Sequence, residues 1–392
     1  MKAFEKTLLL ASPTMHSEEL EFVHEAFDKN WIAPLGFNCD GFEKEISDYL
    51  TGGLPTLATT SGTSALHLAL KLAGLKTGER VFCSDLTFAA SVNPVCYEGG
   101  IPVLIDSERE TWNMDPDALE EAFAKYPGTK YVVVVHLFGT PAKMDEILAI
   151  CERHGAALIE DAAESLGSEY NGKKCGTFGA YSALSFNGNK IITTSGGGML
   201  ITKSKEDRDK ALFFATQTRE PAPWYQHKEL GYNYRMSNVV AGIGRGQLLH
   251  LKEHCDKKAA IYNRYKTGFA GIPVKMNPYL SCSHPNFWLS CITVDPEYLC
   301  EQRRTDLASC WVHEAGKSCP DEIAATLQKY NVQTRPLWKP MHLQPYYEKN
   351  DFIGNGVDED LFARGICLPS DIKMTEEEQN DVIEIIKSCF EA

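Results

Sequence analysis

The chain has 392 residues, which is more than a single ordinary domain needs, so we expect two domains or one large domain with an appendage. Apolar residues make up 43% of the sequence and charged residues 23%, which is typical of a globular protein with a sizeable core and argues against long disordered stretches. The net charge of −14 argues against nucleic-acid binding, because that function usually needs basic patches. A small anionic ligand in a locally positive pocket is still compatible with this charge.

Two further features bear on the cellular compartment. The apolar run of residues 8–11 is far shorter than the roughly 7–15 residues of a signal-peptide core, and no apolar stretch approaches the roughly 20 residues of a membrane span. The 13 cysteines are scattered singly without a C-x-x-C pair, as expected for small buried residues in a reducing compartment; examples are Cys83, Cys151 and Cys367. We therefore expect a cytoplasmic protein with no membrane partner.

From about residue 54 to residue 202, short apolar runs alternate with amphipathic segments. The runs that predict strands are brief, partly β-branched and bounded by Gly, Pro or Asp, and they cover residues 54–59, 81–84, 103–106, 131–136, 157–160, 181–186 and 198–202. Apolar residues at helical spacing predict helices over residues 63–75 and 144–154. Strands that alternate with helices predict an α/β fold with a mostly parallel sheet between helices.

The texture of the sequence changes after about residue 250. A long helical region, 248–269, leads to a Pro- and Cys-rich stretch at 271–296 and then to predicted helices at 321–330 and 375–390. The last helix opens with Thr375 and Glu378 at capping-box spacing. We expect a large domain over residues 1–250 and a smaller α+β domain over residues 251–392.

Residues 60–64, with the sequence TSGTS, follow a predicted strand and open a predicted helix. The free N–H groups of a helix N-terminus, a glycine that allows close approach and several hydroxyl groups together suit a phosphate. Serine and threonine also open helices as simple N-caps, and alone this motif fits that structural role better.

Residues 159–165, with the sequence IEDAAES, stand at the C-terminal end of a predicted buried strand. In open α/β sheets, ligands bind at this edge. A carboxylate there can hold a protonated pyridine nitrogen, which keeps a pyridine ring effective as an electron sink. An N-cap for the next helix explains the carboxylate about equally well when the motif is considered alone.

Residues 185–190, with the sequence SFNGNK, follow another predicted strand. Most lysines are solvated surface charges. Lys190 differs from them because it follows Asp161 by 29 residues and lies on a neighbouring strand–loop unit of the same sheet edge. A desolvated amine in this place would be nucleophilic near neutral pH and could form an imine with an aldehyde cofactor.

Together with GYNYRMSNV (231–239), which alone predicts no function, these motifs closely resemble the DegT/DnrJ/EryC1/StrS family of sugar aminotransferases. Order, spacing and residue identity agree across TSGTSALHLAL, IEDAAESLGS and SFNGNKIITTSGGGML, and NWIAPLG, RPLWKPMH and GICLPS extend the match almost end to end. The chain is most similar to the branch that makes 4-amino-4,6-dideoxy sugars from UDP-linked 4-keto precursors, as in bacillosamine-type pathways. The resemblance implies the α/β architecture of fold type I aminotransferases, which use pyridoxal 5'-phosphate (PLP).

The resemblance implies a role for each cofactor-binding residue. Lys190 would be the catalytic residue, which binds the cofactor covalently and later moves a proton between the substrate carbon and the cofactor. Asp161 would pair with the pyridine nitrogen, and Glu164 would lie near the ring hydroxyl. The other cofactor-binding residues would be Phe88, which stacks on the ring, and the phosphate-binding set Gly62, Thr63, Ser185 and, from the other subunit, Asn233.

The resemblance also implies substrates and an assembly. An amino group would pass from L-glutamate to the 4-keto position of a UDP-linked 4-keto-6-deoxy amino sugar, for glycan or polysaccharide biosynthesis. The enzyme would be a homodimer with shared active sites and would use no metal ion. The residues that would face the sugar nucleotide are Asn30, Trp31, Ile32, Ala33, Trp338 and Lys339.

One position departs from this branch. The segment NFWLS (286–290) has Phe287 where similar sequences have arginine. If that arginine contacts the nucleotide, recognition of the diphosphate differs in this chain. Another nucleotide-linked keto sugar, with a 3-keto group or a dTDP carrier, is therefore an alternative substrate.

Three other functions compete with a transaminase. Family members that replace the lysine with histidine are dehydratases, but this chain has Lys190. A catalytically silent PLP-binding sensor with the same fold is the second alternative, and the intact pair of Asp161 and Lys190 argues against it. A nicotinamide oxidoreductase is the third, suggested by GIGRG at 242–246. That run lies in a helical pattern and not after a strand, so close helix packing explains its glycines better.

Overall fold

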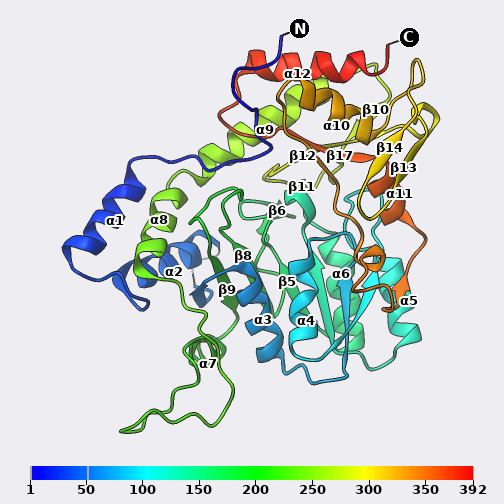
Figure 1. Cartoon of the computed structure of the whole chain (residues 1–392). Coiled ribbons are helices and arrows are strands. Elements are labelled where there is room, and N and C mark those ends of the chain that lie inside the picture. Colours follow the sequence, from blue (N-terminus) through cyan, green and yellow to red (C-terminus); the bar gives the residue numbers. More distant parts are fainter. Residues whose placement is uncertain (1, 51–52, 392) are drawn as a thin grey trace.

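The structure is a computed structural model that describes residues 2–50 and 53–391 (Figure 1). Its largest feature is an eight-stranded sheet. The strand order across this sheet is β1 (Thr56–Thr59), β9 (Gly198–Thr202), β8 (Tyr181–Ser185), β5 (Ala157–Asp161), β4 (Tyr131–Val135), β2 (Arg80–Ser84), β3 (Ile101–Ile105) and β16 (Phe352–Ile353).

Most neighbours in this sheet are parallel. The strands from β8 to β16 run parallel to one another, whereas β9 runs antiparallel to both β1 and β8. The mostly parallel α/β sheet is therefore confirmed. Seven of its strands coincide with the seven predicted strands, and their ends shift by at most two residues.

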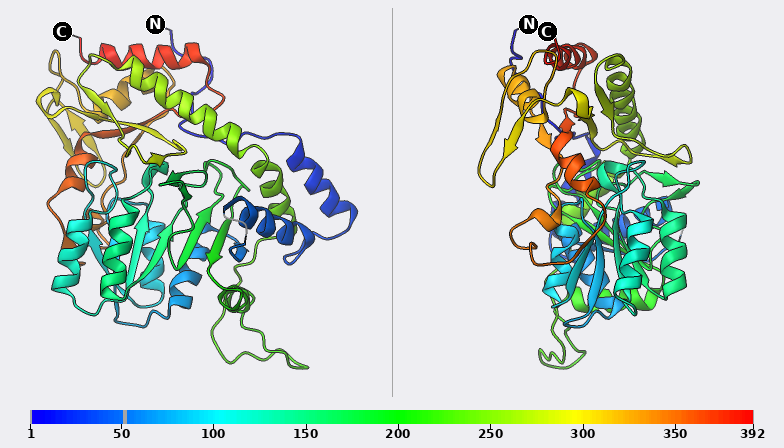
Figure 2. Two further views of the ribbon diagram at one scale, coloured as in Figure 1. Left: turned by 180° about the vertical axis from the view of Figure 1, so that it is seen from behind. Right: turned by 90° about the vertical axis from the view of Figure 1, so that its right-hand side faces the viewer.

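Helices cover both faces of the large sheet (Figure 2). Because successive side chains of a strand point to opposite faces, Cys83 and Val133 pack with the helices of one face, and Phe82 and Val132 with those of the other. The first face carries α3 (Gly62–Ala73), α4 (Asn93–Tyr97) and α7 (Lys205–Ala215). The second face carries α5 (Pro116–Lys125) and α6 (Met144–His154).

Three helices pack together, namely α1 (Glu18–Asp28), α2 (Phe37–Leu50) and α8 (Asn238–Leu248). Of these, only the helical pattern around residues 242–246 of α8 was predicted. The glycines of the GIGRG run all lie in α8. A Cβ atom added at Gly246 would meet the backbone of Glu19 at 2.5 Å, and one added at Gly242 would meet the side chain of Asn38 at 2.9 Å. Close helix packing therefore explains these glycines. The run does not form the turn of a dinucleotide-binding motif, because it lies inside a helix.

The C-terminal half of the chain builds an antiparallel sheet with the order β10 (Val274–Met276), β12 (Ser290–Val294), β17 (Gly365–Leu368) and β15 (Arg335–Pro336). Ile292 shares a core there with residues of three helices, α9 (Leu251–Gly268), α10 (Pro320–Lys329) and α12 (Glu376–Ser388). The predicted capping box of α12 is present, with Thr375 and Glu378 bonded reciprocally.

Short elements connect these two parts. A three-stranded sheet joins β11 (Ser283–His284) to β6 (Glu169–Tyr170) and β7 (Lys173–Lys174), and a hairpin is formed by β13 (Gln302–Arg304) and β14 (Ser309–Trp311). β16 lies at the edge of the large sheet, beside β3, and the following α11 (Val357–Arg364) contacts β12 and β17 of the antiparallel sheet. Conversely, Leu8, from the N-terminal segment, packs into the core of the C-terminal half. The division at residue 250 stays a prediction.

Among the described residues, no helix is both long enough and apolar enough to cross a membrane.

Candidate active site

The carboxyl ends of two neighbouring parallel strands define the candidate site. β5 ends at Asp161, which lies beside Ala183 of β8, and the loop that follows β8 carries Lys190. The sequence therefore placed these two groups correctly on adjacent strand–loop units, at the edge where α/β sheets bind ligands.

Asp161 is a fully buried carboxylate with two hydrogen-bond donors. Ser91 Oγ donates to Oδ2 at 2.6 Å, and the Ala163 N–H donates to Oδ1 at 3.0 Å. Burial raises the pKa of Asp161, and these two donors and the charge of Lys190 oppose the rise. A cation placed against this carboxylate would relieve the cost of burying its charge, so the residue fits a protonated ring nitrogen.

Lys190 lies between a carboxylate and an aromatic ring. Its Nζ is 3.5 Å from Glu164 Oε1 and 4.0 Å from the centroid of the Trp288 ring, and 13% of its side chain is exposed. Burial raises the pKa of Glu164, whereas the charge of Lys190 and the Phe138 N–H, which donates at 2.6 Å, lower it. The amine is therefore largely sheltered from water and lies between two groups that attract a cation.

The start of α3 lies against the end of β8. Ser61 caps the helix by accepting the Ser64 N–H at 3.0 Å, which leaves the N–H groups of Gly62 and Thr63 without intrahelical acceptors. A Cβ atom at Gly62 would sit 3.0 Å from Ser185 Cβ and 3.4 Å from Ser185 Oγ. Gly62, Thr63 and Ser185 are thus brought together, as a phosphate-binding site requires.

Phe88, Trp338 and Lys339 line a cavity of about 500 Å³ together with the exposed Tyr346. The rings of Phe88 and Trp338 are 5.4 Å apart, and 56% of Phe88 is exposed. Lys339 Nζ lies 3.3 Å from the Asp306 carboxylate of the β13–β14 hairpin. The cavity combines aromatic walls with one cation.

Two other predicted groups, Asn233 and the loop after α1, are exposed. Asn233 is exposed in the segment between α7 and α8, where Thr60 donates its backbone N–H to the neighbouring Tyr234 at 2.9 Å. The substrate-facing group Asn30, Trp31, Ile32 and Ala33 is exposed in the loop after α1. Asn238 at the start of α8 binds this loop through Trp31 O and Ala33 O. No contact joins this loop to Lys190 among the hydrogen bonds, ion pairs and ring contacts of the described residues.

Phe287 packs among aromatic side chains of the C-terminal half. Its ring packs against Tyr262 at 4.6 Å and Tyr279 at 5.5 Å between ring centroids, and its backbone has a φ of 53°. The departure at this position therefore places an aromatic ring among tyrosines of the C-terminal half, while the next residue, Trp288, turns toward the lysine.

Sequence reasoning missed three residues of the site: Ser91, Asn286 and Trp288. Ser91 stands three positions after Phe88, and a short helical turn brings its hydroxyl to Asp161. The pairing of β11 with β6 brings Asn286 and Trp288 to the sheet edge from about a hundred residues further along the chain. The sequence analysis identified the motif NFWLS, but it did not predict that Trp288 of this motif contacts Lys190.

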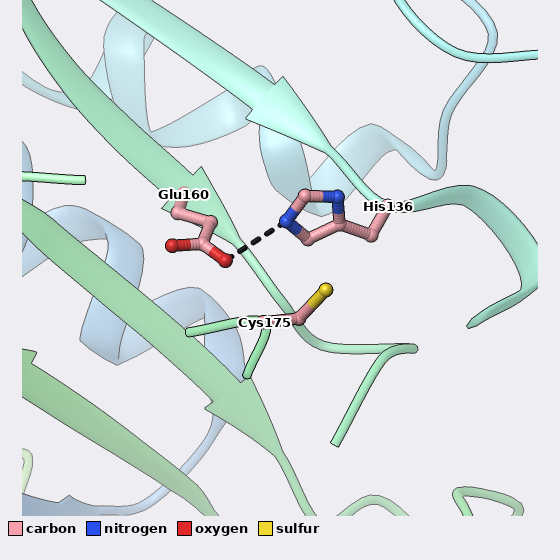
Figure 3. Close-up of side chains that lie close together, drawn as sticks. All are labelled: His136, Glu160 and Cys175. Carbon is pink, nitrogen blue, oxygen red and sulfur yellow. Dashed lines mark hydrogen bonds and ion pairs between the residues drawn. The ribbon is translucent and has the colours of Figure 1, made fainter. Parts of the chain in front are cut away.

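A buried cluster of residues of metal-ligand types lies at the ends of β4 and β5 (Figure 3). The potential ligand atoms of His136, Glu160 and Cys175 lie within 4.8 Å of one another. His136 Nδ1 accepts the Ala142 N–H at 3.1 Å, and its Nε2 donates to Glu160 at 2.8 Å. Glu160 also accepts several further donors, including the N–H groups of Gly176, Phe178 and Gly179 and the Ser182 hydroxyl. His136 and Glu160 are thus hydrogen-bonded within the protein. We therefore interpret the cluster as a structural one that stabilises the ends of these strands.

Taken together, a lysine, a buried carboxylate and a phosphate-binding helix start at this sheet edge fit a phosphorylated pyridine aldehyde. The fold and the site define a PLP-dependent aminotransferase. The sequence profile of the DegT/DnrJ/EryC1/StrS aminotransferase family matches residues 13–387, and the chain belongs to this family. Its cofactor is PLP, and it is a sugar aminotransferase.

Individual relatives agree with this assignment. The chain is 45% identical to EpsN of Bacillus subtilis (strain 168), which is assigned to the pyridoxal phosphate-dependent aminotransferases, with 98% of this chain and 96% of EpsN covered. It is 33% identical to GDP-perosamine synthase of Escherichia coli O157:H7, with 98% and 99% covered. The crystal structure of a DegT DnrJ EryC1 StrS aminotransferase from Brucella abortus superposes with a TM-score of 0.84 at 26% identity, with 95% of both chains covered.

Proposed function

We propose that the protein transfers the amino group of L-glutamate to the 4-keto position of a UDP-linked 4-keto-6-deoxy amino sugar. The product, a UDP-4-amino-4,6-dideoxy sugar, would serve glycan or polysaccharide biosynthesis. The observation that carries the transfer is the placement of Lys190 beside Glu164 and near Asp161 at one sheet edge. The choice of a UDP-linked 4-keto sugar rests on the sequence motifs.

PLP would supply an aldehyde that accepts the amino group and a ring that draws electrons from the substrate carbon. Lys190 would hold the cofactor and carry the proton on Nζ. Asp161, oriented by Ser91, would keep the ring nitrogen protonated. Gly62, Thr63 and Ser185 would bind the phosphate at the start of α3.

The cavity beside Phe88 supports a nucleotide-linked substrate. Lys339 supplies a positive charge that can bind a diphosphate. Trp338 and Tyr346 supply apolar surface for a sugar or a base. Lys339 is paired with a single, largely exposed carboxylate, which an incoming phosphate could replace. The net charge of −14 does not oppose this role because a cation in a pocket can bind an anion locally.

A GDP-linked sugar is the second candidate. The observation that favours it is the 33% identity to GDP-perosamine synthase over nearly the whole of both chains. The departure at Phe287 leaves this candidate open. The Phe287 side chain packs among tyrosines and offers no cation to a nucleotide, unlike the arginine of the UDP-sugar branch.

We further propose a homodimer in which Asn233 completes the site of the partner subunit. Asn233 is exposed, and the loop that precedes it extends away from the body of the molecule (Figure 1). This loop carries Trp224 and Tyr225, which are 66% and 75% exposed, and the loop after α1 exposes Trp31 and Ile32. Apolar surface of this kind commonly marks an interface between copies.

The test is a panel of acceptors with isotopically labelled L-glutamate and purified enzyme. The panel contains UDP-linked, GDP-linked and dTDP-linked 4-keto-6-deoxy sugars and a dTDP-linked 3-keto sugar, and mass spectrometry detects the labelled nitrogen in the sugar. The proposal predicts the fastest transfer to the UDP-linked acceptor and none with Lys190→Ala. Faster transfer to the GDP-linked acceptor would select the second candidate. Bound PLP without transfer to any acceptor would favour a sensor.

A further inference from the structure

The amine of Lys190 is held by two walls of different chemistry. Glu164 presents a carboxylate oxygen 3.5 Å from Nζ, and the indole of Trp288 presents its face with the centroid 4.0 Å from Nζ. Both walls are almost completely buried, at 5% and 2% exposed. A carboxylate and an aromatic face both attract an ammonium group, and the attraction strengthens where water is excluded.

Trp288 is fixed in place by polar contacts on three sides. Its indole N–H donates to Asn189 O at 2.7 Å, its backbone N–H donates to Asn286 Oδ1 at 2.8 Å, and its carbonyl accepts the buried Lys258 ammonium at 2.9 Å. The contact to Asn189 is one residue from Lys190. The ring therefore supports the lysine loop and the lysine amine at the same time.

Asn286 joins the two walls to each other. Its Nδ2 donates to the carbonyl oxygens of Glu164 and Leu166, both at 2.9 Å, while its Oδ1 accepts from Trp288. The packing at this joint is tight, because a Cβ atom at Gly139 would fall 1.9 Å from Asn286 Oδ1. The buried side chain of Asn286 thus fixes the distance between Glu164 and Trp288.

Two strained backbone positions aim groups at this place. Phe138, whose N–H donates to Glu164, and Phe287, which precedes Trp288, both have a φ of 53°. Bulky residues rarely adopt this left-handed conformation, and it persists only where surrounding contacts enforce it. Both strained residues adjoin the walls around the amine, which is the pattern expected where geometry serves function.

We propose that Trp288 is a positioning residue, which with Glu164 forms a resting place for the free amine of Lys190. The proposal rests on the proposed function in that Lys190 is taken as the cofactor lysine. Such a lysine is free during part of each turnover, and its flexible four-carbon stem would then sample many rotamers. Attraction by the indole and the carboxylate keeps Nζ, with its proton, next to the reaction site.

The test replaces Trp288 with a series of fluorinated tryptophans in the apoenzyme. Fluorine weakens the negative face of the ring while it keeps the shape and the N–H of the side chain. Trace acetic anhydride then acylates amines, and mass spectrometry compares Lys190 with the exposed Lys252, whose side chain is 86% exposed. The same series at Trp311, which is on β14 and 36% exposed, is the matched control.

We expect acylation of Lys190 relative to Lys252 to rise with each added fluorine at Trp288, by about threefold to tenfold over the series, and to stay constant at Trp311. Unchanged acylation throughout the Trp288 series, or an equal rise in the Trp311 series, would overturn the proposal. The measurement uses no cofactor. Failure of Lys190 to bind PLP would therefore refute the proposed function without altering the acylation result.

Discussion

Asp161 shows how much depends on the surroundings of a single carboxylate. It is fully buried, its pKa is raised by that burial, and it is oriented by a hydroxyl 2.6 Å away. In this environment the free energy of the carboxylate depends strongly on whether a cation faces it, because charges interact more strongly where water is excluded. A protonated ring nitrogen and the negative charge of Asp161 therefore stabilise each other.

Asp161→Asn keeps the shape of the side chain and removes its charge. We expect PLP to remain bound through the phosphate site, while the turnover number falls by about 100-fold or more because the ring no longer keeps its proton. Absorbance of bound PLP and single-turnover kinetics with L-glutamate measure the two effects separately. Ser91→Ala, which removes only the orienting hydrogen bond, should cause a smaller loss. Near-wild-type turnover of Asp161→Asn would refute the role of this carboxylate.

Part of the site could be predicted from the sequence at this scale, and part could not. Lys190 and Asp161 directly follow buried strands, so strand order alone brings them together. Trp288 and Asn286 depend on packing between segments that are about a hundred residues apart, and no local pattern encodes that packing. The roles assigned to the cofactor-binding residues remain predictions.

At the scale of single elements, strands were easier to predict than helices. Buried strands carry continuous apolar runs, and all seven predicted strands are present. The helical pattern around residues 242–246 is confirmed by α8, although each of Gly242, Gly244 and Gly246 lowers helix propensity by about 1 kcal/mol relative to alanine. Close packing against α1 compensates in the folded protein. β16 has two residues, too few for any periodic signal, and exists because it pairs with β3.

Two carboxylates of α11, Asp358 and Asp360, have pKa values that are shifted in opposite directions. Asp106 occupies the helix N-terminus and accepts the N–H groups of residues 355–358. Asp358 is left buried beside it, and burial together with the charges of Asp85 and Asp106 raises the pKa of Asp358 well above 3.8. Two residues later, hydrogen bonds from Arg364, aided by Arg109, lower the pKa of Asp360 to about 2.

These shifts predict opposite effects of two neighbouring substitutions. The folded state keeps the proton of Asp358 above pH 3.8, where the unfolded chain loses it, so this residue costs stability increasingly as the pH rises toward its raised pKa. Asp358→Asn should raise the thermal midpoint slightly at pH 5 and by roughly 2 °C or more at pH 8. Asp360 stabilises the fold above its unfolded pKa, and this contribution is lost as the pH falls through its folded pKa.

Asp360→Asn on the same helix is therefore the matched control, and it should lower the midpoint at both pH values. Calorimetric scans of the two variants and the wild type at pH 5 and pH 8 provide the measurement. A midpoint of Asp358→Asn at pH 8 that is equal to or lower than that of the wild type would contradict the buried-carboxyl interpretation.

At the scale of the whole molecule, the two halves of the candidate site differ in how they are placed. The cofactor-binding groups around Lys190 lie at the carboxyl edge of the large sheet and are largely buried, whereas Asn233 and the loop after α1, which is bound by Asn238 of α8, are exposed. The sequence motifs predicted both groups, and the family resemblance implied that Asn233 serves the site of the other subunit. A shared site would reunite the two groups across a two-fold axis.

Mixed dimers test this arrangement. Lys190→Ala removes the cofactor amine, and Asn233→Asp places a negative charge against the phosphate, so each homodimer should be nearly inactive. In a mixed dimer with shared sites, one site carries both lesions and the other carries none. Equal mixing should therefore restore up to about a quarter of wild-type activity by two-fold symmetry. Activity that stays at the level of the separate variants after verified subunit exchange would show that Asn233 serves its own chain.

Reductive capture tests most directly whether Lys190 is the residue that carries PLP. The holoenzyme is treated with borohydride, digested, and analysed by mass spectrometry for peptides that bear the reduced cofactor. The cofactor mass should appear on the peptide that contains Lys190 and should disappear in Lys190→Ala, while Lys258, a buried lysine near Trp288, stays unmodified. Capture of the cofactor on Lys258 or any other lysine of the wild-type enzyme would contradict the assignment of the active site.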